Sequence, residues 1–421
     1  MSYIIPFVSH RFRPRPRAER LSRLMGRVGR AVMGDGSSTA DEFVPALGAG
    51  DQVAPDLVPA VRLREATDDD ERLWDAFLRG QPAADFLQTW AWGAVATFDG
   101  EPVHRFVLED RGQVAGVVAV QERTSRGLRT WYAPHGPVLD ATHPRAATRL
   151  RALVDGLRAA GRHAGVMAVR LEPRLDREEA ATSRFGELGL RHIATTVQVG
   201  RTQLLDIGGS EADVLLRVDG PTRRKIRRAA RDGITTAVTT DPAATDAVHR
   251  LQQIVRETEL RSGAAGRGLE RIGVAWRAFA SRGSAAIVEA WDGDRLMAAG
   301  MVVVTGERSV YLFSGSRREA PGTPKRFPSY AMQWEMIRVA RHMGAITHDL
   351  WGIEPAGAGP EHPWAGIGAF KRSFGGRSVA WSGGWDLVLR PSLYHLREAT
   401  AEVRSRLLHP VRAARPATRA A

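Results

Sequence analysis

The chain has 421 residues, 43% of them hydrophobic, which is enough for two domains with cores of their own. Its net charge of +13 and its pI of about 11.0 favour an anionic partner such as nucleic acid, acidic lipid or a phosphorylated substrate; arginine-, alanine- and glycine-rich codon usage in the host is the alternative explanation. The absence of cysteine excludes disulfides, thiolate metal sites and a cysteine nucleophile.

Residues 1–60 are predicted to form a basic tail and linker. Arginine alternates with proline between residues 11 and 17, which is typical of an extended arm. Arginines then recur at helical spacing between residues 20 and 30, which predicts a short basic amphipathic helix that docks on anionic lipid or on RNA phosphate. A disordered arginine-rich leader is the alternative. No run of about 18 apolar residues occurs, so no transmembrane helix is expected.

The first folded unit is predicted to span residues 61–190. A hairpin is its clearest signal, because two strand-like runs flank the turn residues Asp110-Arg111-Gly112. The elements expected in chain order are a strand at 61–65, helices at 68–79 and 86–92, hairpin strands at 103–109 and 114–121, a strand from 130, a helix at 144–160, a strand at 166–171 and a short helix at 183–188.

The second unit is predicted to span residues 191–376. Its expected elements are a strand pair at 195–199 and 203–207, a helical region at 211–231 broken at Gly220-Pro221, a helix at 245–262, a hairpin with strands at 285–290 and 297–304, a strand at 310–314, a helix at 329–343 and a strand at 346–351. Both units share one order of strands and helices. This is the mixed α/β order of an acyltransferase-like fold, and it occurs twice.

Two predictions concern the end of the chain. Residues 378–389 read as a late pair of strands that returns to complete the first unit's sheet, so residues 377–398 are assigned to the first domain. Residues 399–421 are predicted to form a basic C-terminal tail.

The clearest charge cluster lies at residues 221–231. On a helix, Arg223, Arg227 and Arg231 share one face. The residues expected to turn inward are Ile226, Ala229 and Ala230. Cations on one helix face repel each other unless an anion is near, and guanidinium groups bind phosphate in bidentate fashion. A solvated helix face is the alternative interpretation.

A second candidate is Lys371, which stands between Phe370 and Phe374 in a glycine-rich stretch. We expect this stretch to be a loop that folds closely onto a ligand, because glycine permits positive φ angles and close backbone approach. A lysine flanked by aromatic residues is a candidate for a fixed cation in a partly desolvated site. A solvated lysine on a loop anchored by the phenylalanines is the alternative.

The sequence carries no signature of a metal site or of a serine nucleophile. The 12 histidines are scattered and form no H-x-x-x-H or H-E-x-x-H pattern. The G-x-S-x-G elbow and the phosphate-binding G-x-x-x-x-G-K-[ST] loop are also absent. No metal ion is therefore expected.

Five stretches, in order along the chain, resemble the motifs of the Fem family (FemABX-like). Members of this family are non-ribosomal transferases that move an amino acid from aminoacyl-tRNA to the peptide stem of a peptidoglycan precursor. The stretches are Phe86–Trp92, Tyr132–Val138, Thr222–Gly233, Ser329–Ile337 and Asp349–Gly376. Five motifs in order are specific to the family, though not to one substrate.

The resemblance implies two acyltransferase-like (GNAT-type) domains with mixed central sheets, and it implies roles for individual residues. In the family, an arginine that opens the basic helix binds precursor phosphate, a lysine acts in transfer and an acid contacts the muropeptide. These positions match Arg223, Lys371 and Glu172. The aromatic residues predicted to bind substrate are Trp92, Tyr330, Trp351 and Phe370. The remaining cations, predicted to bind tRNA or phosphate, are Arg224, Lys225, Arg227 and Arg228.

The chain departs from the family pattern at two places. A phosphate-contacting lysine of the family would fall at Ala96, which puts the usual mode of holding the precursor in doubt. The coiled-coil arm of some members would fall near residues 292–294 and is absent from the sequence.

The chemistry implied by the resemblance needs no cofactor or metal, because aminoacyl-tRNA, the co-substrate, is already an activated ester. The acceptor amine must be neutral and positioned, and the developing oxyanion must be stabilised, a task for Lys371. Glu172 is a candidate general base. We therefore expect a cytoplasmic or membrane-peripheral aminoacyltransferase, with its basic tail on the inner face of the plasma membrane. Its acceptor would be the stem-peptide amine of lipid II or UDP-MurNAc-pentapeptide, in cross-bridge formation.

Three alternatives remain open. The first is an enzyme of the same fold that tailors a small peptide metabolite with aminoacyl-tRNA, which Ala96 favours. The second is a non-catalytic protein that binds nucleic acid or membrane and requires only the charge. The third is an acyl-CoA-dependent acetyltransferase, although the chain has no clear R-x-x-G-x-G pyrophosphate loop.

Overall fold

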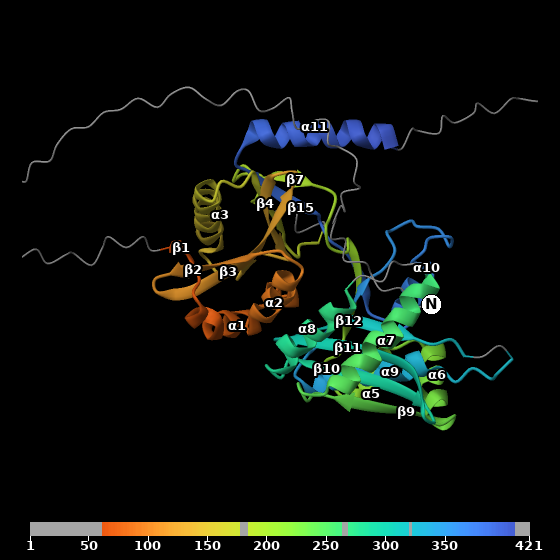
Figure 1. The fold of residues 1–421 in the computed structure, drawn as a ribbon. Coiled ribbons are helices and arrows are strands. Elements are labelled where there is room, and N and C mark those ends of the chain that lie inside the picture. The colour runs from red at the N-terminus through yellow and green to blue at the C-terminus, as the bar shows by residue number, and fades with distance from the viewer. Residues whose placement is uncertain (1–60, 177–183, 263–267, 320–321, 409–421) are drawn as a thin grey trace, which may run out of the picture. The chain divides into compact units, whose positions relative to one another are not determined.

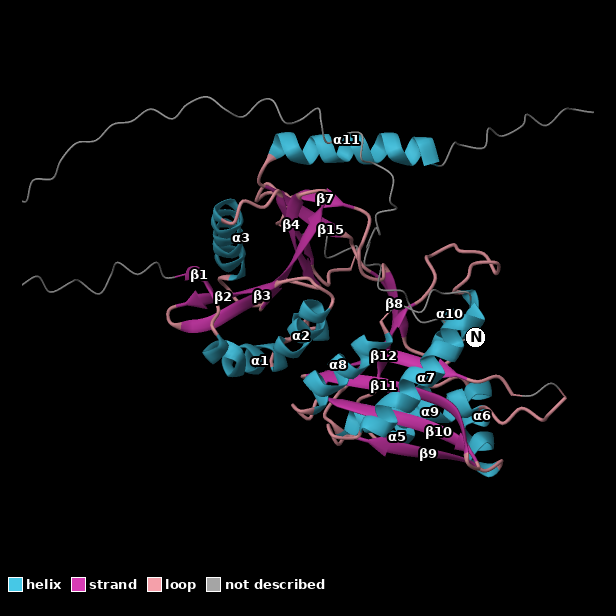
Figure 2. Ribbon diagram, in the orientation of Figure 1, coloured by secondary structure: helices cyan, strands magenta, loops and turns pink. Residues whose placement is uncertain are grey.

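Two mixed β-sheets, each with its own helices, make up the described part of the chain (Figure 1, Figure 2). The computed structural model describes residues 61–176, 184–262, 268–319 and 322–408. The predicted tail at 1–60, with its basic helix, lies outside the described residues, and so does the end of the C-terminal tail from residue 409. We call the residues that build the first sheet and its helices the first half, and those that build the second sheet the second half.

The first sheet has the strand order β1-β2-β3-β4-β6-β15-β7, with β5 paired to β3. The strands are β1 (Val61–Glu65), β2 (Val103–Asp110), β3 (Gln113–Ser125), β4 (Leu128–Pro134), β5 (Val138–Leu139), β6 (Ala168–Glu172), β7 (Arg191–Ile193) and β15 (Gly384–Val388). Only β4 and β6 run parallel among these pairs. The predicted first hairpin is confirmed, since Asp110 pairs with Gln113 across the turn.

The second sheet has the strand order β14-β8-β13-β12-β11-β10-β9. The strands are β8 (Arg201–Asp206), β9 (Ile234–Thr239), β10 (Ala285–Asp292), β11 (Arg295–Thr305), β12 (Arg308–Ser316), β13 (Thr347–Gly352) and β14 (Arg377–Ala380). Only β12 and β13 run parallel among these pairs. Asp292 pairs with Arg295, and every residue of this hairpin is described, so it holds no coiled-coil arm.

Helices pack on both sheets. They are α1 (Glu71–Arg79), α2 (Trp90–Phe98), α3 (Ala146–His163), α5 (Glu211–Arg217), α6 (Gly220–Arg231), α7 (Thr245–Ser262), α8 (Leu269–Ala280), α9 (Pro328–His342), α10 (Ala365–Arg372) and α11 (Pro391–Leu408). Helix α3 lies against the first sheet (Figure 2). It buries Leu153 and Leu157 there. Helix α9 buries Met336 and Ile337 against alternate residues of β10 and β11, which face one side of the second sheet.

Several predicted elements are wrong, and most of these errors involve pairing between distant segments. Residues 195–199 form no strand, and β8 pairs instead with β13 and β14. The described residues 184–189 form turns rather than a helix. The late strands do not pair with each other, because β14 joins the second sheet and only β15 joins the first. The domain boundaries themselves stay a prediction.

The break predicted at Gly220-Pro221 is displaced by two residues. Helix α5 ends at Arg217, and Gly220 and Pro221 open α6. Proline is tolerated in the first turn of a helix, where its missing N–H has no intrahelical partner in any case. Strand β9 and helices α8, α10 and α11 were not expected from the sequence.

Candidate active site

Lys371 is a buried lysine near the C-terminal end of α10, with 2% of its surface exposed. Its Nζ donates a hydrogen bond to the carbonyl oxygen of Gly352, at the end of β13, over 2.7 Å. Burial lowers the pKa of Lys371 to about 7, although the carboxylates of Asp349 and Glu354 oppose the shift. A lysine tuned to this range can donate or take up a proton near neutral pH. The alternative of a solvated lysine is wrong.

The glycine-rich loop predicted around Lys371 is in fact a helix. Its Gly368 lies so close to Glu354 that a Cβ at this position would stand 1.7 Å from the Glu354 Oε2. Glu354 in turn forms an ion pair with Arg372 of the same helix over 2.5 Å. The glycine therefore serves close packing of α10 on the segment after β13, and not a loop conformation.

The two phenylalanines that flank Lys371 in the sequence meet each other instead of enclosing its ammonium group. The ring of Phe370 lies edge-on to that of Phe374 at 5.3 Å, and Tyr330 of α9 contacts both rings, at 5.0 Å and 5.8 Å. The Lys371 ammonium instead lies 5.9 Å from the ring centre of Tyr311 on β12. Successive helical residues point about 100° apart, which separates the lysine from its aromatic neighbours.

The basic cluster lies on α6, as predicted, but several of its cations have partners. Arg223 donates from Nη1 to the carbonyl oxygens of Leu216 and Val218, over 2.7 and 2.6 Å, at the end of α5. Lys225 donates to the Tyr330 hydroxyl over 3.0 Å and lies 4.5 Å from that ring. Lys225, Tyr330 and Phe370 are thereby brought together.

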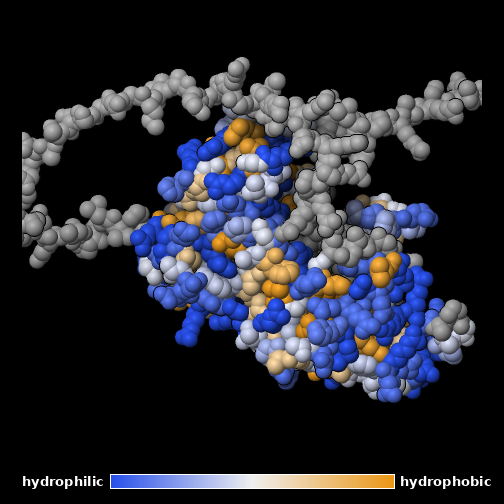
Figure 3. All heavy atoms as spheres, viewed as in Figure 1, coloured by the Kyte–Doolittle hydropathy of each residue, from blue (hydrophilic) through white to orange (hydrophobic). Residues whose placement is uncertain are grey.

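The rest of α6 is more open. Arg228 pairs with Asp232 over 3.0 Å, while Arg224 and Arg227 are exposed. Ile226 and Ala229 are buried as expected, whereas Ala230 is exposed, which corrects its inward assignment. The surface around α6 is predominantly hydrophilic (Figure 3). These exposed arginines remain available to a phosphate, but nothing in the structure assigns them a ligand.

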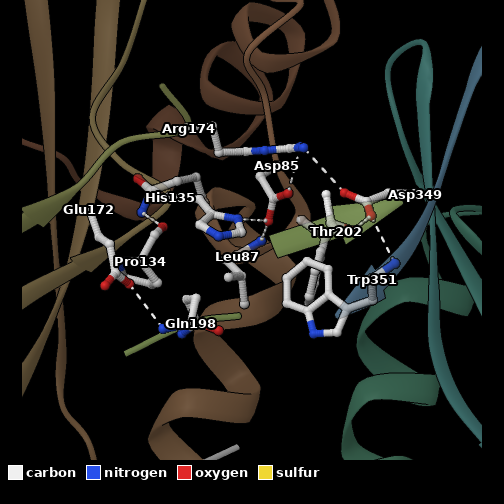
Figure 4. A network of polar contacts seen from close by, with 12 residues as sticks. Asp85, Leu87, Pro134, His135, Glu172, Arg174, Gln198, Thr202, Asp349 and Trp351 are labelled. Atoms are coloured by element: carbon white, nitrogen blue, oxygen red, sulfur yellow. Dashed lines mark hydrogen bonds and ion pairs between the residues drawn. The ribbon is translucent and has the colours of Figure 1, made fainter. Parts of the chain in front are cut away.

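Glu172, at the end of β6, is buried and accepts three hydrogen bonds from other groups of the protein. One carboxylate oxygen accepts a hydrogen bond from the Val197 amide over 2.6 Å. The other accepts from the Gln198 amide over 3.1 Å (Figure 4). The same oxygen accepts from the Tyr132 hydroxyl. Glu172 therefore ties the segment at 197–198 to the first sheet, and three of the roughly four acceptor sites of its carboxylate are occupied. Its proposed contact with the muropeptide stays a prediction.

Four buried polar residues form a network that the sequence did not indicate as a unit: Asp85, His135, Arg174 and Asp349 (Figure 4). Arg174 donates from Nη1 to Asp85 over 3.0 Å and from Nη2 to Asp349 over 3.2 Å. His135 Nδ1 lies 3.1 Å from Asp85. Asp349 also accepts from the Thr202 hydroxyl and, over 2.8 Å, from the Trp351 amide.

The pKa values of the two carboxyl groups in this network are shifted in opposite directions. Burial alone would raise the pKa of Asp85, but His135 and Arg174 outweigh it and lower the pKa to about 2. Burial raises the pKa of Asp349, and the contacts with Arg174 and Thr202 do not overcome it. Asp349 begins the stretch that leads to Lys371, and Asp85 immediately precedes another motif. Charged residues at the edges of apolar motifs were the signal that could have identified them.

The two predicted substrate-binding tryptophans both contact Phe86. Its ring is 4.9 Å from that of Trp92 and 5.2 Å from that of Trp351. Trp351 also lies 5.5 Å from the His135 ring and has a positive φ of 64°. Trp92, Trp351 and the Gly352 carbonyl that holds Lys371 are thus connected, whereas Arg223 belongs to the separate α5–α6 junction.

Comparison with known proteins shows to which family the chain belongs. Residues 70–270 and 281–401 match the FemAB family. The chain belongs to the FemAB family. A lipid II:glycine glycyltransferase of Staphylococcus aureus is 22% identical over 402 residues, covering 77% of this chain and 93% of that protein. The enzyme of the same name from Staphylococcus epidermidis is 33% identical over 103 residues, a match that spans 24% of either protein.

The solved structure of FemX has the same fold. It superimposes with a TM-score of 0.71 at 18% identity, covering 80% of this chain and 99% of that one. The resemblance to the Fem family, the aminoacyltransferase class and the fold of two acyltransferase-like halves without a coiled-coil arm are confirmed. Among the described residues, no helix is long and apolar enough to cross a membrane, and no three acidic or histidine side chains gather as metal ligands would.

Proposed function

We propose that this FemAB-family protein transfers an amino acid from aminoacyl-tRNA to the stem-peptide amine of a peptidoglycan precursor, either lipid II or UDP-MurNAc-pentapeptide. The product would be a cross-bridge. The observation that carries the proposal is Lys371, a wholly buried lysine with a pKa lowered to about 7, held at the end of β13 in a chain of this family. The glycyltransferase names of two relatives support the substrate class.

In this reaction the acceptor amine attacks the carbonyl carbon of the aminoacyl ester. The new C–N bond forms a tetrahedral intermediate, and the C–O bond to the tRNA ribose then breaks. The amine loses one proton overall and the ribose hydroxyl gains one. The ammonium group of Lys371 has three N–H donors, so Nζ would keep its hydrogen bond to Gly352 and donate a second one to the oxyanion, which exists only in the transition state. No cofactor or metal ion is required in this scheme.

We assign the precursor phosphate to α6. Arg223 Nη1 already serves the carbonyls of Leu216 and Val218, so a phosphate would be bound by the rest of the guanidinium group. Exposed Arg224 and Arg227 would extend the site toward tRNA or phosphate, with Lys225 and Arg228 beside them. The basic tail would hold the enzyme at the inner face of the plasma membrane, where lipid-linked precursor is found.

The test is transfer by the purified full-length protein. Pools of charged tRNA are incubated with lipid II or with UDP-MurNAc-pentapeptide, and the precursor is examined by mass spectrometry. We expect the mass of one added amino acid, dependent on charged tRNA and abolished when the tRNA is deacylated first. If no charged tRNA modifies either precursor, the proposed function is wrong.

One observation favours a second candidate, the tailoring of a peptide metabolite by aminoacyl-tRNA. Ala96 stands where the family pattern has a phosphate-contacting lysine, and it is buried in α2 with 2% of its surface exposed. A short, buried side chain at this position offers no cation to a phosphate. Transfer to small peptide amines, but to neither precursor, would select this alternative. A protein that only binds nucleic acid or membrane would not need a buried lysine such as Lys371.

A further inference from the structure

Arg174 joins the two halves of the protein at a buried point. It follows β6 of the first half, and its side chain is 2% exposed. One arm of its guanidinium binds Asp85 of the first half over 3.0 Å, and the other binds Asp349 on β13 of the second half over 3.2 Å. The face of the guanidinium covers the Trp381 ring at 4.5 Å. A planar fork of this kind fixes both the distance and the direction between its two partners.

Each carboxylate that Arg174 holds is itself anchored within its own half. Asp85 accepts a hydrogen bond from the Leu87 amide over 3.1 Å and lies 3.1 Å from His135 (Figure 4). Asp349 accepts from the Thr202 hydroxyl on β8 and from the Trp351 amide. The bridge therefore connects two fixed points and not two mobile side chains.

The second of these fixed points leads directly to Lys371. The Trp351 amide that Asp349 holds belongs to a residue with a positive φ of 64°, which orients the following Gly352. The Gly352 carbonyl accepts the hydrogen bond of Lys371 over 2.7 Å. An unbroken series of contacts thus runs from the first half, through Arg174 and Asp349, to the Lys371 ammonium.

Besides the ring contacts of Trp351 with Phe86 and His135, two ion pairs join the halves away from this series. Arg271 of α8 binds Asp99 over 3.1 Å, and Arg282 binds Glu71 over 3.0 Å, on partly exposed surfaces. These pairs join the second half to helices α1 and α2 of the first half, but neither pair contacts Lys371. Exposed ion pairs also stabilise little compared with the cost of leaving a buried charge unpaired.

We propose that Arg174 is a positioning residue for transfer: it holds the two halves at the spacing at which Lys371, fixed to the second half, reaches an acceptor bound against the first half. The proposal rests on the proposed function and on the predicted contact of the muropeptide with Glu172, which places the acceptor amine against the first half while the precursor phosphate lies on α6. Displacing a reacting group by about 1 Å can cost about 100-fold in rate, which is why a bridge far from the reacting atoms can control the rate.

The positioning can be measured without any substrate. The chain has no cysteine, so Arg151→Cys on α3 and Gln253→Cys on α7, both at exposed positions, introduce one spin label in each half. We expect Arg174→Met to broaden or shift the distance distribution between the labels in pulsed electron-electron spectroscopy. Arg250→Met is the matched control, because it breaks a similar two-bond pair, with Glu289, inside the second half. An unchanged distribution in Arg174→Met overturns the proposal.

The kinetic consequence is measured in single-turnover transfer. Arg174→Met should lower the transfer rate about 10–100-fold, while the KM for each substrate stays within about threefold of wild type. Arg271→Met, which breaks a contact between the halves elsewhere, should retain the wild-type rate. A rate loss that is matched by a rise in KM would make Arg174 a binding residue and would contradict positioning.

Arg174→Lys covers the case in which Arg174→Met does not fold. It keeps the buried charge, but an ammonium group cannot hold both carboxylates in the geometry of the fork, so the rate should still fall by about tenfold. Wild-type rate and wild-type label distances in Arg174→Lys would overturn the proposal. If wild-type protein transfers nothing, the proposed function has failed, while the label distances still report on the bridge. A shift in distance with an unchanged rate would show a structural bridge and reject the positioning role.

Discussion

At the scale of single residues, Lys371 combines burial with a hydrogen bond to the Gly352 carbonyl and a pKa lowered to about 7. A protonated lysine in such surroundings is a strong hydrogen-bond donor, because the low local dielectric weakens competition from water. The same burial makes its charge costly for the folded state. Replacing the side chain by an uncharged one should therefore lower the transfer rate and also stabilise the folded protein.

We predict that Lys371→Met lowers kcat by about 10²–10³-fold, the range found when one oxyanion donor is removed. Precursor and tRNA affinity should change little, because the lost interaction belongs to the transition state. Single-turnover transfer from charged tRNA, alongside precursor binding, measures both. Lys325→Met, which removes an exposed lysine, is the control and should retain wild-type kcat. Transfer at the wild-type rate in Lys371→Met would remove the lysine from the mechanism.

A pH dependence follows from the same residue. Between pH 7 and the ordinary lysine pKa of 10.5, an unfolded chain holds a proton that folded Lys371 has lost, so stability rises with pH across this window. One pKa unit corresponds to about 1.36 kcal/mol, so the full shift lowers the free energy of unfolding at low pH by roughly 5 kcal/mol. The hydrogen bond from Lys371 to Gly352 offsets part of this loss. Lys371→Met should thus be more stable than wild type near pH 6, with an advantage that shrinks toward pH 10.

Urea denaturation of both proteins at several pH values measures this difference. Transfer should show the opposite trend, because only the protonated lysine donates to the oxyanion, and kcat should fall as pH rises through about 7. A stability difference that does not vary with pH would contradict the lowered pKa of Lys371.

At the scale of elements, α10 depends on a glycine. A Cβ at Gly368 would stand 1.7 Å from the Glu354 carboxylate, whereas one at Gly366, in the same helix, would meet nothing within 4 Å. We predict that Gly368→Ala destabilises the protein by about 1–3 kcal/mol and lowers transfer, because α10 must move and carries Lys371 with it. Gly366→Ala is the matched control and should be neutral or stabilise by up to about 1 kcal/mol. Thermal denaturation and kcat report the two effects, and equal stability of both variants would contradict the packing argument.

The start of α6 presents a second case at this scale, because Arg223 has two possible tasks. Its Nη1 caps the carbonyls of Leu216 and Val218, and its proposed ligand is a phosphate. We predict that Arg223→Ala raises the KM for the precursor by the equivalent of about 1.5–3 kcal/mol and also lowers the melting temperature. Arg256→Ala, which removes an exposed arginine of α7, should do neither. A lower melting temperature with an unchanged KM would leave Arg223 as the cap of α5 alone.

At the scale of the whole molecule, the basic tail should act as a separate membrane contact. Deleting residues 1–59 should leave transfer to soluble UDP-MurNAc-pentapeptide unchanged, because both sheets lie after the deletion. It should weaken binding to vesicles that contain anionic lipid, with each arginine contributing about 1 kcal/mol near such a surface. Vesicle flotation measures the binding, with neutral vesicles as the control. Equal flotation of the full-length and shortened proteins would exclude a role of the tail.

The sequence alone determined what depends on neighbours along the chain. Both hairpins were predicted because their turn residues and strand-like runs are adjacent, and the helix at 245–262 was predicted with the observed bounds because apolar residues recur within it. Lys371 was found as a candidate because its motif is continuous, and the order of five such motifs indicated the family.

Features that depend on distant partners follow from the folded structure and not from any local stretch of sequence. The sequence could not show that β14 and β15 join different sheets, because their pairing partners, β8 and β6, lie far away along the chain. The sequence predicts a loop where α10 forms, because glycine is a poor helix former, and packing against Glu354 overrides that preference. Arg174 lies 89 residues from Asp85 and 175 from Asp349, so neither contact leaves a periodic signal. Burial, which lowers the pKa of Lys371, is a property of the folded chain and not of any local stretch.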